Sequence, residues 1–165
     1  MKKIPLYLLA LLLWSGMASA QDGISISLSS NDPRAEMGPR YDAGDARVAI
    51  RTRDRSTMLL LLDDTIAVQL TDSVLAKIES EKKKKDTNFF EELVLAGVRV
   101  AVGKSVEYPM SGIRSIEYRG GVLRIVNDQN KAVFTELKVN GTEVLRDFSS
   151  ADAARFVNAF RARRR

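Results

Sequence analysis

Two tight-turn signals in the C-terminal half of the chain constrain its fold most strongly. Gly120-Gly121 and Asn140-Gly141 each separate two segments in which apolar and polar residues alternate. Two-residue loops of this kind place their central residues at positive φ and join antiparallel strands. With a further turn at residues 127–130, the sequence predicts a four-strand antiparallel meander between residues 113 and 148.

A helix should follow this meander. Ser149 with Asp152 has the pattern of a helix start, in which the serine oxygen accepts a backbone N–H of the first turn. The next apolar residues recur at helical spacing and form one stripe: Ala153, Phe156, Val157 and Phe160. We expect this stripe to pack against the sheet and leave the polar face in water.

The preceding part of the chain predicts more strands and an inserted helical pair. Residues 47–53 read as an edge strand that alternating arginines keep from pairing with other chains. Residues 58–62 and 65–70 read as a hairpin around Asp63-Asp64, and its first arm is apolar on both faces. Helices should begin near Asp72 and at Asn88, while residues 98–103 fit either a helix or a strand. The fold class is therefore α+β, with an antiparallel sheet, an inserted helical pair and an amphipathic C-terminal helix.

Successive hairpins closed by one C-terminal helix, whose start reads Phe148-Ser149-Ser150-Ala151-Asp152, resemble the second half of a pleckstrin-homology-like (PH-like) domain. The resemblance covers about residues 113–160 and lies in the arrangement of elements. It implies a split barrel and a role in binding or scaffolding, and it transfers no site residue. The helical insertion at about residues 72–103 departs from that family.

The N-terminus has the three parts of a secretory signal. Lys2 and Lys3 precede an apolar run at 4–14, and Ala18 and Ala20 fit the cleavage site. We expect cleavage after Ala20 and delivery to the periplasm or the medium. The next residue is Gln21 rather than cysteine, so we expect no lipid anchor. Pro33, Gly38, Pro39 and Gly44 then predict a loop at residues 29–46. The expected division is a signal at 1–20, a flexible segment at 21–46 and one domain at 47–165.

The composition excludes several classes of catalytic site. With no histidine and no cysteine, the chain cannot form Ser-His, Cys-His or His-ligated metal sites. The candidate carboxylates that remain are Asp63-Asp64, Glu91-Glu92 and Asp45, and we interpret the two pairs as a turn and a helix start. We therefore expect no catalytic residue, no metal ligand and no cofactor.

Arginines crowd the C-terminal end of a chain whose formal net charge is +5. The simplest interpretation is a solvated helix end, since cations stabilise a helix C-terminus. The alternative is contact with an anionic envelope surface, and its candidate residues are Arg155, Arg161, Arg163, Arg164 and Arg165.

The sequence thus predicts a non-catalytic envelope module that binds another envelope protein or an anionic surface. Export argues against a nucleic-acid partner, and no transmembrane segment is expected after signal removal. The alternative function is a small envelope hydrolase of peptidoglycan or glycan that uses carboxylates alone.

Overall fold

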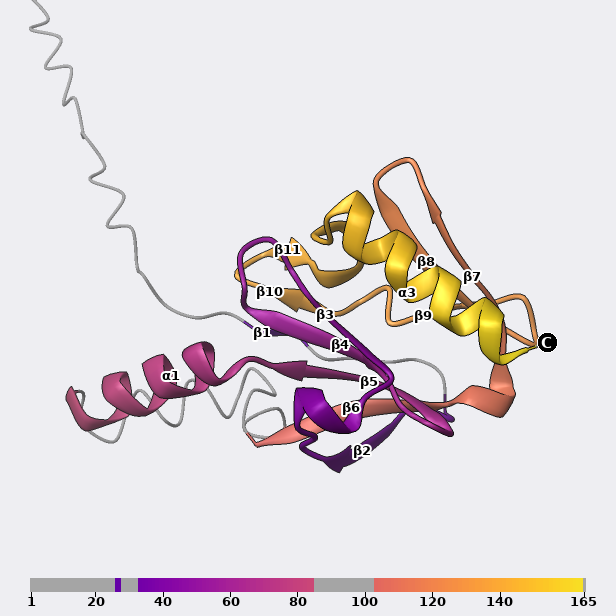
Figure 1. Ribbon diagram of the computed structural model, residues 1–165. Helices are drawn as coiled ribbons and strands as arrows, with labels where there is room; N and C mark the ends of the chain where they lie inside the picture. Colours follow the sequence, from indigo (N-terminus) through magenta and orange to yellow (C-terminus); the bar gives the residue numbers. More distant parts are fainter. Residues whose placement is uncertain (1–25, 28–32, 85–102, 165) are drawn as a thin grey trace, which may run out of the picture.

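The computed structural model describes residues 26–27, 33–84 and 103–164 of the chain (Figure 1). Within these residues, antiparallel sheets combine with two α-helices, α1 and the C-terminal α3. The mixed α+β class expected from the sequence is confirmed. No helix in these ranges is both long enough and apolar enough to cross a membrane.

The large sheet has five antiparallel strands in the order β2-β6-β5-β4-β3. Their bounds are β2 Glu36–Pro39, β3 Val48–Arg51, β4 Thr57–Leu61, β5 Thr65–Leu70 and β6 Lys104–Pro109. The predicted hairpin is confirmed, with β4 and β5 joined at Asp63-Asp64 and every residue of β4 buried. The arginine-flanked strand β3 lies at an edge of this sheet, also as predicted.

A hairpin sheet contains β7 (Ile113–Arg119), β8 (Val122–Asn127) and the short β9 (Ala132–Val133). Gly120 and Gly121 have φ of 59° and 78°, which confirms the two-residue turn. The predicted continuous meander of four strands is wrong. The strands β10 (Lys138–Val139) and β11 (Thr142–Glu143) do form the hairpin predicted across Asn140-Gly141, whose φ values are 52° and 75°, but they join β1 (Ile26–Ser27) in a separate small sheet.

The meander ends at β9 because the side chains of both Val133 and Phe134 are buried. Consecutive strand residues point to opposite faces, yet both of these side chains are almost fully buried. Phe134 takes a φ of 63°, which ends the strand and turns its ring into the core. There the ring packs edge-on against Tyr108, with centroids 6.3 Å apart.

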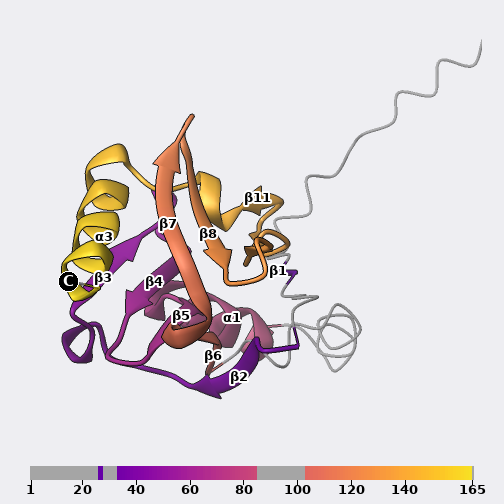
Figure 2. The same cartoon turned by 90° about the vertical axis from the view of Figure 1, so that its right-hand side faces the viewer.

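The C-terminal helix α3 (Ser150–Arg163) separates the edges of the two larger sheets. It contacts β3 of the large sheet and β7 of the hairpin sheet, and in Figure 2 it runs along the side of the molecule next to both. The sheets do not close into a barrel. The physical reason is that α3 occupies the space in which β3 and β7 would have to approach each other.

The predicted cap and stripe of this helix are both confirmed. Ser149 Oγ accepts the Asp152 N–H at 3.1 Å. The four stripe residues are at most 5 % exposed and belong to the main core: Ala153, Phe156, Val157 and Phe160.

The segment before β3 corrects a second expectation. A loop was predicted at residues 29–46, but Glu36–Pro39 forms strand β2 and pairs with β6. After it, Tyr41 and Ala46 pack on a second apolar cluster, which consists of Met58, Leu60, Leu62 and Ala67. Because β4 is apolar on both faces, its second face also needs cover, and this segment supplies it.

The inserted helical region is described only in part. Helix α1 (Asp72–Lys84) confirms the first predicted helix. The helix predicted from Asn88 and the helix-or-strand alternative at 98–102 lie outside the described residues. The predicted signal at 1–20 lies outside them as well.

Candidate functional site: an arginine-lined groove

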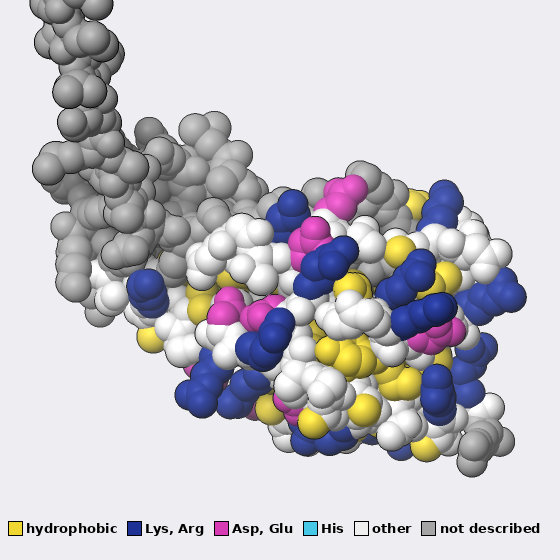
Figure 3. Space-filling model, turned by 90° about the horizontal axis from the view of Figure 1, so that it is seen from above, with side chains coloured by type: hydrophobic (Ala, Val, Ile, Leu, Met, Phe, Trp, Pro, Cys, Tyr) yellow, Lys and Arg dark blue, Asp and Glu magenta, His cyan; other side chains and the backbone are white. Residues whose placement is uncertain are grey.

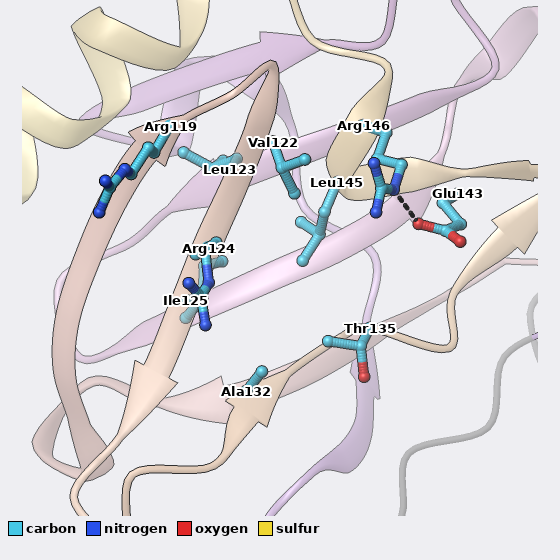
Figure 4. Close-up of a pocket in the computed structure, with 10 residues that line it drawn as sticks. All are labelled: Arg119, Val122, Leu123, Arg124, Ile125, Ala132, Thr135, Glu143, Leu145 and Arg146. Carbon is cyan, nitrogen blue, oxygen red and sulfur yellow. Dashed lines mark hydrogen bonds and ion pairs between the residues drawn. The ribbon is translucent and has the colours of Figure 1, made fainter.

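A groove of about 540 Å³ lies between the β7-β8 hairpin and the short 3-10 helix η4 (Val144–Arg146) (Figure 4). It draws its walls from three separate stretches of the chain. The lining residues are Arg119, Val122, Leu123, Arg124, Ile125, Ala132, Thr135, Glu143, Leu145 and Arg146.

One wall carries two arginines on the outer face of the hairpin. Arg119 pairs in register with Val122, and Arg124 is the next residue of β8 on the same face. The Cα atoms of such diagonal neighbours lie roughly 7–8 Å apart. Both guanidinium-bearing side chains are exposed, and neither has an ion-pair partner within 4 Å in the part of the chain that the structure describes. Glu117 stands opposite Arg124 in the register without forming such a pair.

The other wall is built by η4 and the strand before it. Arg146 Nε donates to Glu143 Oε2, so these two charges are already paired. Between the walls lie Val122 and the nearly buried Leu145 (Figure 4). The groove therefore has an apolar floor, a cationic wall with unpaired charge and a second wall whose charges compensate each other.

These groups suit recognition of an anion more than bond cleavage. A guanidinium presents donors in a fixed fork that binds a carboxylate or a phosphate through two parallel hydrogen bonds. Glu143 is the single carboxylate among the lining residues, whereas carboxylate-based glycoside hydrolysis requires two. Within the described ranges, no cluster of three or more His, Cys, Asp or Glu residues could hold a metal ion.

The C-terminal arginines singled out from the sequence are placed along α3, and most of them bind the protein itself. Arg155 donates to Ala49 O of β3 at 3.1 Å and to Asp152 Oδ1 at 2.9 Å. Arg163 donates to Leu62 O at 3.1 Å. These contacts hold α3 to the β3 edge and to the β4-β5 turn.

The end of α3 is fixed to the hairpin sheet by a similar contact. Arg164 donates to Arg114 O of β7 and lies 5.6 Å from the centre of the Phe160 ring. Arg161 is exposed and lines a second hollow of about 350 Å³, together with Glu117 and Arg114. Arg165 lies outside the described residues.

These arginines contribute to a broad cationic side of the molecule. Seen from above, Lys and Arg side chains gather on the right in Figure 3, where α3 ends and β7 runs in Figure 1. The groove is lined from β8 and η4, whereas the second hollow is lined from β7 and α3.

The carboxylates considered from the sequence do not converge on a site. Asp63 Oδ1 accepts Arg47 Nε at 2.6 Å, and this hydrogen bond, the charge of Arg47 and the more distant Arg163 lower the pKa of Asp63. Asp45 accepts the Asp42 N–H at 3.3 Å and belongs to the 3-10 helix η1 (Ala43–Asp45). The pair Glu91-Glu92 lies outside the described residues.

Sequence reasoning missed the three arginines of the groove. Arg119 and Arg124 could have been found, because the alternation that predicts the hairpin also places them with Val122 on its polar face. Arg146 could not, since its position opposite that face depends on how η4 packs beside β8. No protein-family model, curated protein or solved structure matches the chain.

Proposed function

We propose that this chain is an exported, non-catalytic envelope module that binds an anionic partner in the groove between the β7-β8 hairpin and η4. The observation that carries this proposal is the pair of exposed arginines, Arg119 and Arg124, which lack ion-pair partners among the described residues and flank an apolar floor. Unpaired guanidinium groups of this kind attract an anion and give the charge complementarity that selects a partner.

Export is supported by the N-terminal residues alone. Lys2 and Lys3, the apolar run at 4–14 and the small residues Ala18 and Ala20 together fit a cleaved secretory signal. In the periplasm or the medium, the partner would be another envelope protein or an anionic surface.

The hydrolase alternative has less support. The groove contains one carboxylate, Glu143, and Arg146 already binds it. A general acid with a neighbouring nucleophile or base would need a second carboxylate about 5–9.5 Å away across the bond to be cleaved.

The test is charge reversal on the free wall of the groove. The full chain, expressed with residues 1–20 in place and purified after export, is compared with the variant R119E/R124E. Binding to poly-L-glutamate, inorganic polyphosphate and phosphatidylglycerol vesicles is measured at low and moderate salt. We expect the variant to lose about tenfold or more in affinity for at least one probe, because attraction becomes repulsion.

A matched control separates the groove from net charge. Arg51 and Arg55 are exposed arginines on β3 and the following turn, away from the groove lining. R51E/R55E has the same change in net charge and should alter affinity by less than about twofold. Equal losses in both variants would show that only overall charge matters and would refute the proposal, as would release of soluble fragments from peptidoglycan by the wild-type chain.

A further inference from the structure

We infer that the occupant of the groove is an extended acidic segment of a protein partner, rather than a phosphate polymer or a membrane surface. This inference rests on the proposed function and specifies the partner. It draws on the distribution of charge between the two walls and on the spacing of the free arginines.

The walls differ in a way that disfavours a uniform polyanion. Arg119 and Arg124 on one side have no ion-pair partner among the described residues, whereas Glu143 on the other side places a carboxylate directly beside Arg146. A chain of phosphates that filled the groove would bring negative charge against Glu143, and like charges at close range repel. A polypeptide avoids this repulsion because it presents carboxylates toward one wall and backbone N–H donors toward the other.

The spacing of the two free arginines fits an extended peptide. They are diagonal neighbours on the hairpin, and their Cα atoms lie roughly 7–8 Å apart. In a strand, residues two positions apart point to the same side and are about 6.6 Å apart, given a rise of roughly 3.3 Å per residue. Two acidic residues separated by one residue therefore match Arg119 and Arg124, each through a charge-assisted hydrogen bond.

The floor sets a further requirement. Val122 lies in register beside Arg119 and faces Leu145 across the groove (Figure 4). Val122 is adjacent to both arginines, because it pairs with Arg119 and is two residues from Arg124 on β8, so an apolar side chain next to the acidic pair would cover this floor. The volume of about 540 Å³ is within the range of roughly 300–1,000 Å³ that ordinary ligand pockets have. The recognised segment therefore combines two acidic residues spaced by one position with an apolar residue close to them.

The experiment is a selection from a random heptapeptide display library on the full exported chain, followed by anisotropy titration of a labelled peptide with the enriched sequence. We expect enrichment of two acidic residues spaced by one position, with an apolar residue close to them. R119A/R124A should weaken binding of the enriched peptide about tenfold or more, and R51A/R55A should change it by less than about twofold.

A variant of Glu143 gives a second measurement. Its expected result is a gain of affinity, which a folding defect would not produce. Glu143→Gln removes the charge that opposes a polyanion and frees Arg146, so polyphosphate affinity should rise by about fivefold or more while peptide affinity changes less. If Glu143→Gln leaves the ratio of polyphosphate affinity to peptide affinity unchanged, Glu143 does not disfavour a polyanion and the inference is overturned.

The remaining outcomes separate this inference from the proposed function. Enriched peptides without acidic residues, or binding that R119A/R124A leaves unchanged, overturn the inference. If polyphosphate or phosphatidylglycerol vesicles bind in an Arg119- and Arg124-dependent way while acidic peptides do not, the function stands and the peptide partner is wrong. If no anionic probe binds, both are wrong.

Discussion

The side-chain amide of Gln69 forms two hydrogen bonds with the backbone of Tyr41. Tyr41 N–H donates to Gln69 Oε1 at 3.0 Å, and Gln69 Nε2 donates to Tyr41 O at 2.8 Å. Gln69 is 3 % exposed on strand β5. Its amide therefore pairs with both the N–H and the C=O of Tyr41, as the backbone of a neighbouring strand would. This pairing holds the segment after β2 across the second face of the large sheet.

The first prediction tests this contact. Gln69→Leu keeps a side chain of similar size but removes both partners of the Tyr41 backbone, so we expect the free energy of unfolding to fall by about 1–3 kcal/mol. The measurement is urea denaturation followed by circular dichroism. Gln129→Leu changes an exposed glutamine whose side chain forms no hydrogen bond with the residues that the structure describes, and it should cost less than about 0.5 kcal/mol. Equal effects would show that the Gln69 amide is not important for stability.

The second prediction concerns the buried stripe of α3. Phe156 is fully buried in the main core, so Phe156→Ala should lower the free energy of unfolding by about 3–5 kcal/mol through lost burial and the cavity left behind. Asn158→Ala, on the exposed side of the same helix, is the control and should have little effect. Thermal and urea denaturation of both variants test the prediction, and a mild effect of Phe156→Ala would mean that α3 does not pack on the core in solution.

The third prediction distinguishes two arginines of the same helix. Arg163 donates to Leu62 O at 3.1 Å and its side chain is 30 % exposed, whereas Arg161 is exposed and lines the second hollow. Arg163→Ala should lower the free energy of unfolding by about 1 kcal/mol, because a charge-assisted bond to the β4-β5 turn is lost. Arg161→Ala should change it by less than about 0.5 kcal/mol. The reverse order in urea denaturation would contradict the structure.

The fourth prediction is a pH dependence. Burial acts to raise the pKa of Asp54, but hydrogen bonds from Ser56 N–H, at 2.9 Å, and from the Thr52 and Ser56 side chains outweigh it and hold this pKa below its ordinary value. A carboxyl group whose pKa is lowered by folding stabilises the protein above its unfolded pKa of about 3.9, and this contribution is lost as the pH falls through the folded pKa.

Asp54→Asn should therefore be less stable than the wild type at neutral pH, and the difference should shrink as the pH is lowered below about 4. Urea denaturation across a pH series measures it. Glu79→Gln, on the exposed surface of α1, is the control and should change the free energy of unfolding at neutral pH by less than about 0.5 kcal/mol. A difference between wild type and Asp54→Asn that stays constant with pH would contradict the assignment.

The fifth prediction concerns processing. If residues 1–20 are a cleaved secretory signal, the exported protein begins at Gln21. Intact-mass measurement on protein recovered from the envelope or the medium should give the mass of residues 21–165. Protein that retains Met1 to Ala20 would contradict the prediction, and replacing Ala18 and Ala20 by Leu should block the cleavage.

The sequence by itself determined those elements whose causes are local. Gly120-Gly121 sets the β7-β8 turn because glycine adopts positive φ without strain. Ser149 and the spacing from Ala153 to Phe160 set the start and the buried face of α3, since a cap and a stripe depend only on neighbours within one helix. The apolar residues of β4 likewise indicated a strand covered on both sides.

Tertiary structure decided the rest, because contacts between distant segments outweighed local preference. Phe134 leaves a strand-like pattern for a φ of 63° since its ring is needed in the core beside Tyr108. The sheets stay open because α3 lies between β3 and β7. The groove exists only because η4 packs beside β8 and brings Arg146 opposite Arg119 and Arg124. No local sequence pattern predicts that η4 and β8 lie side by side.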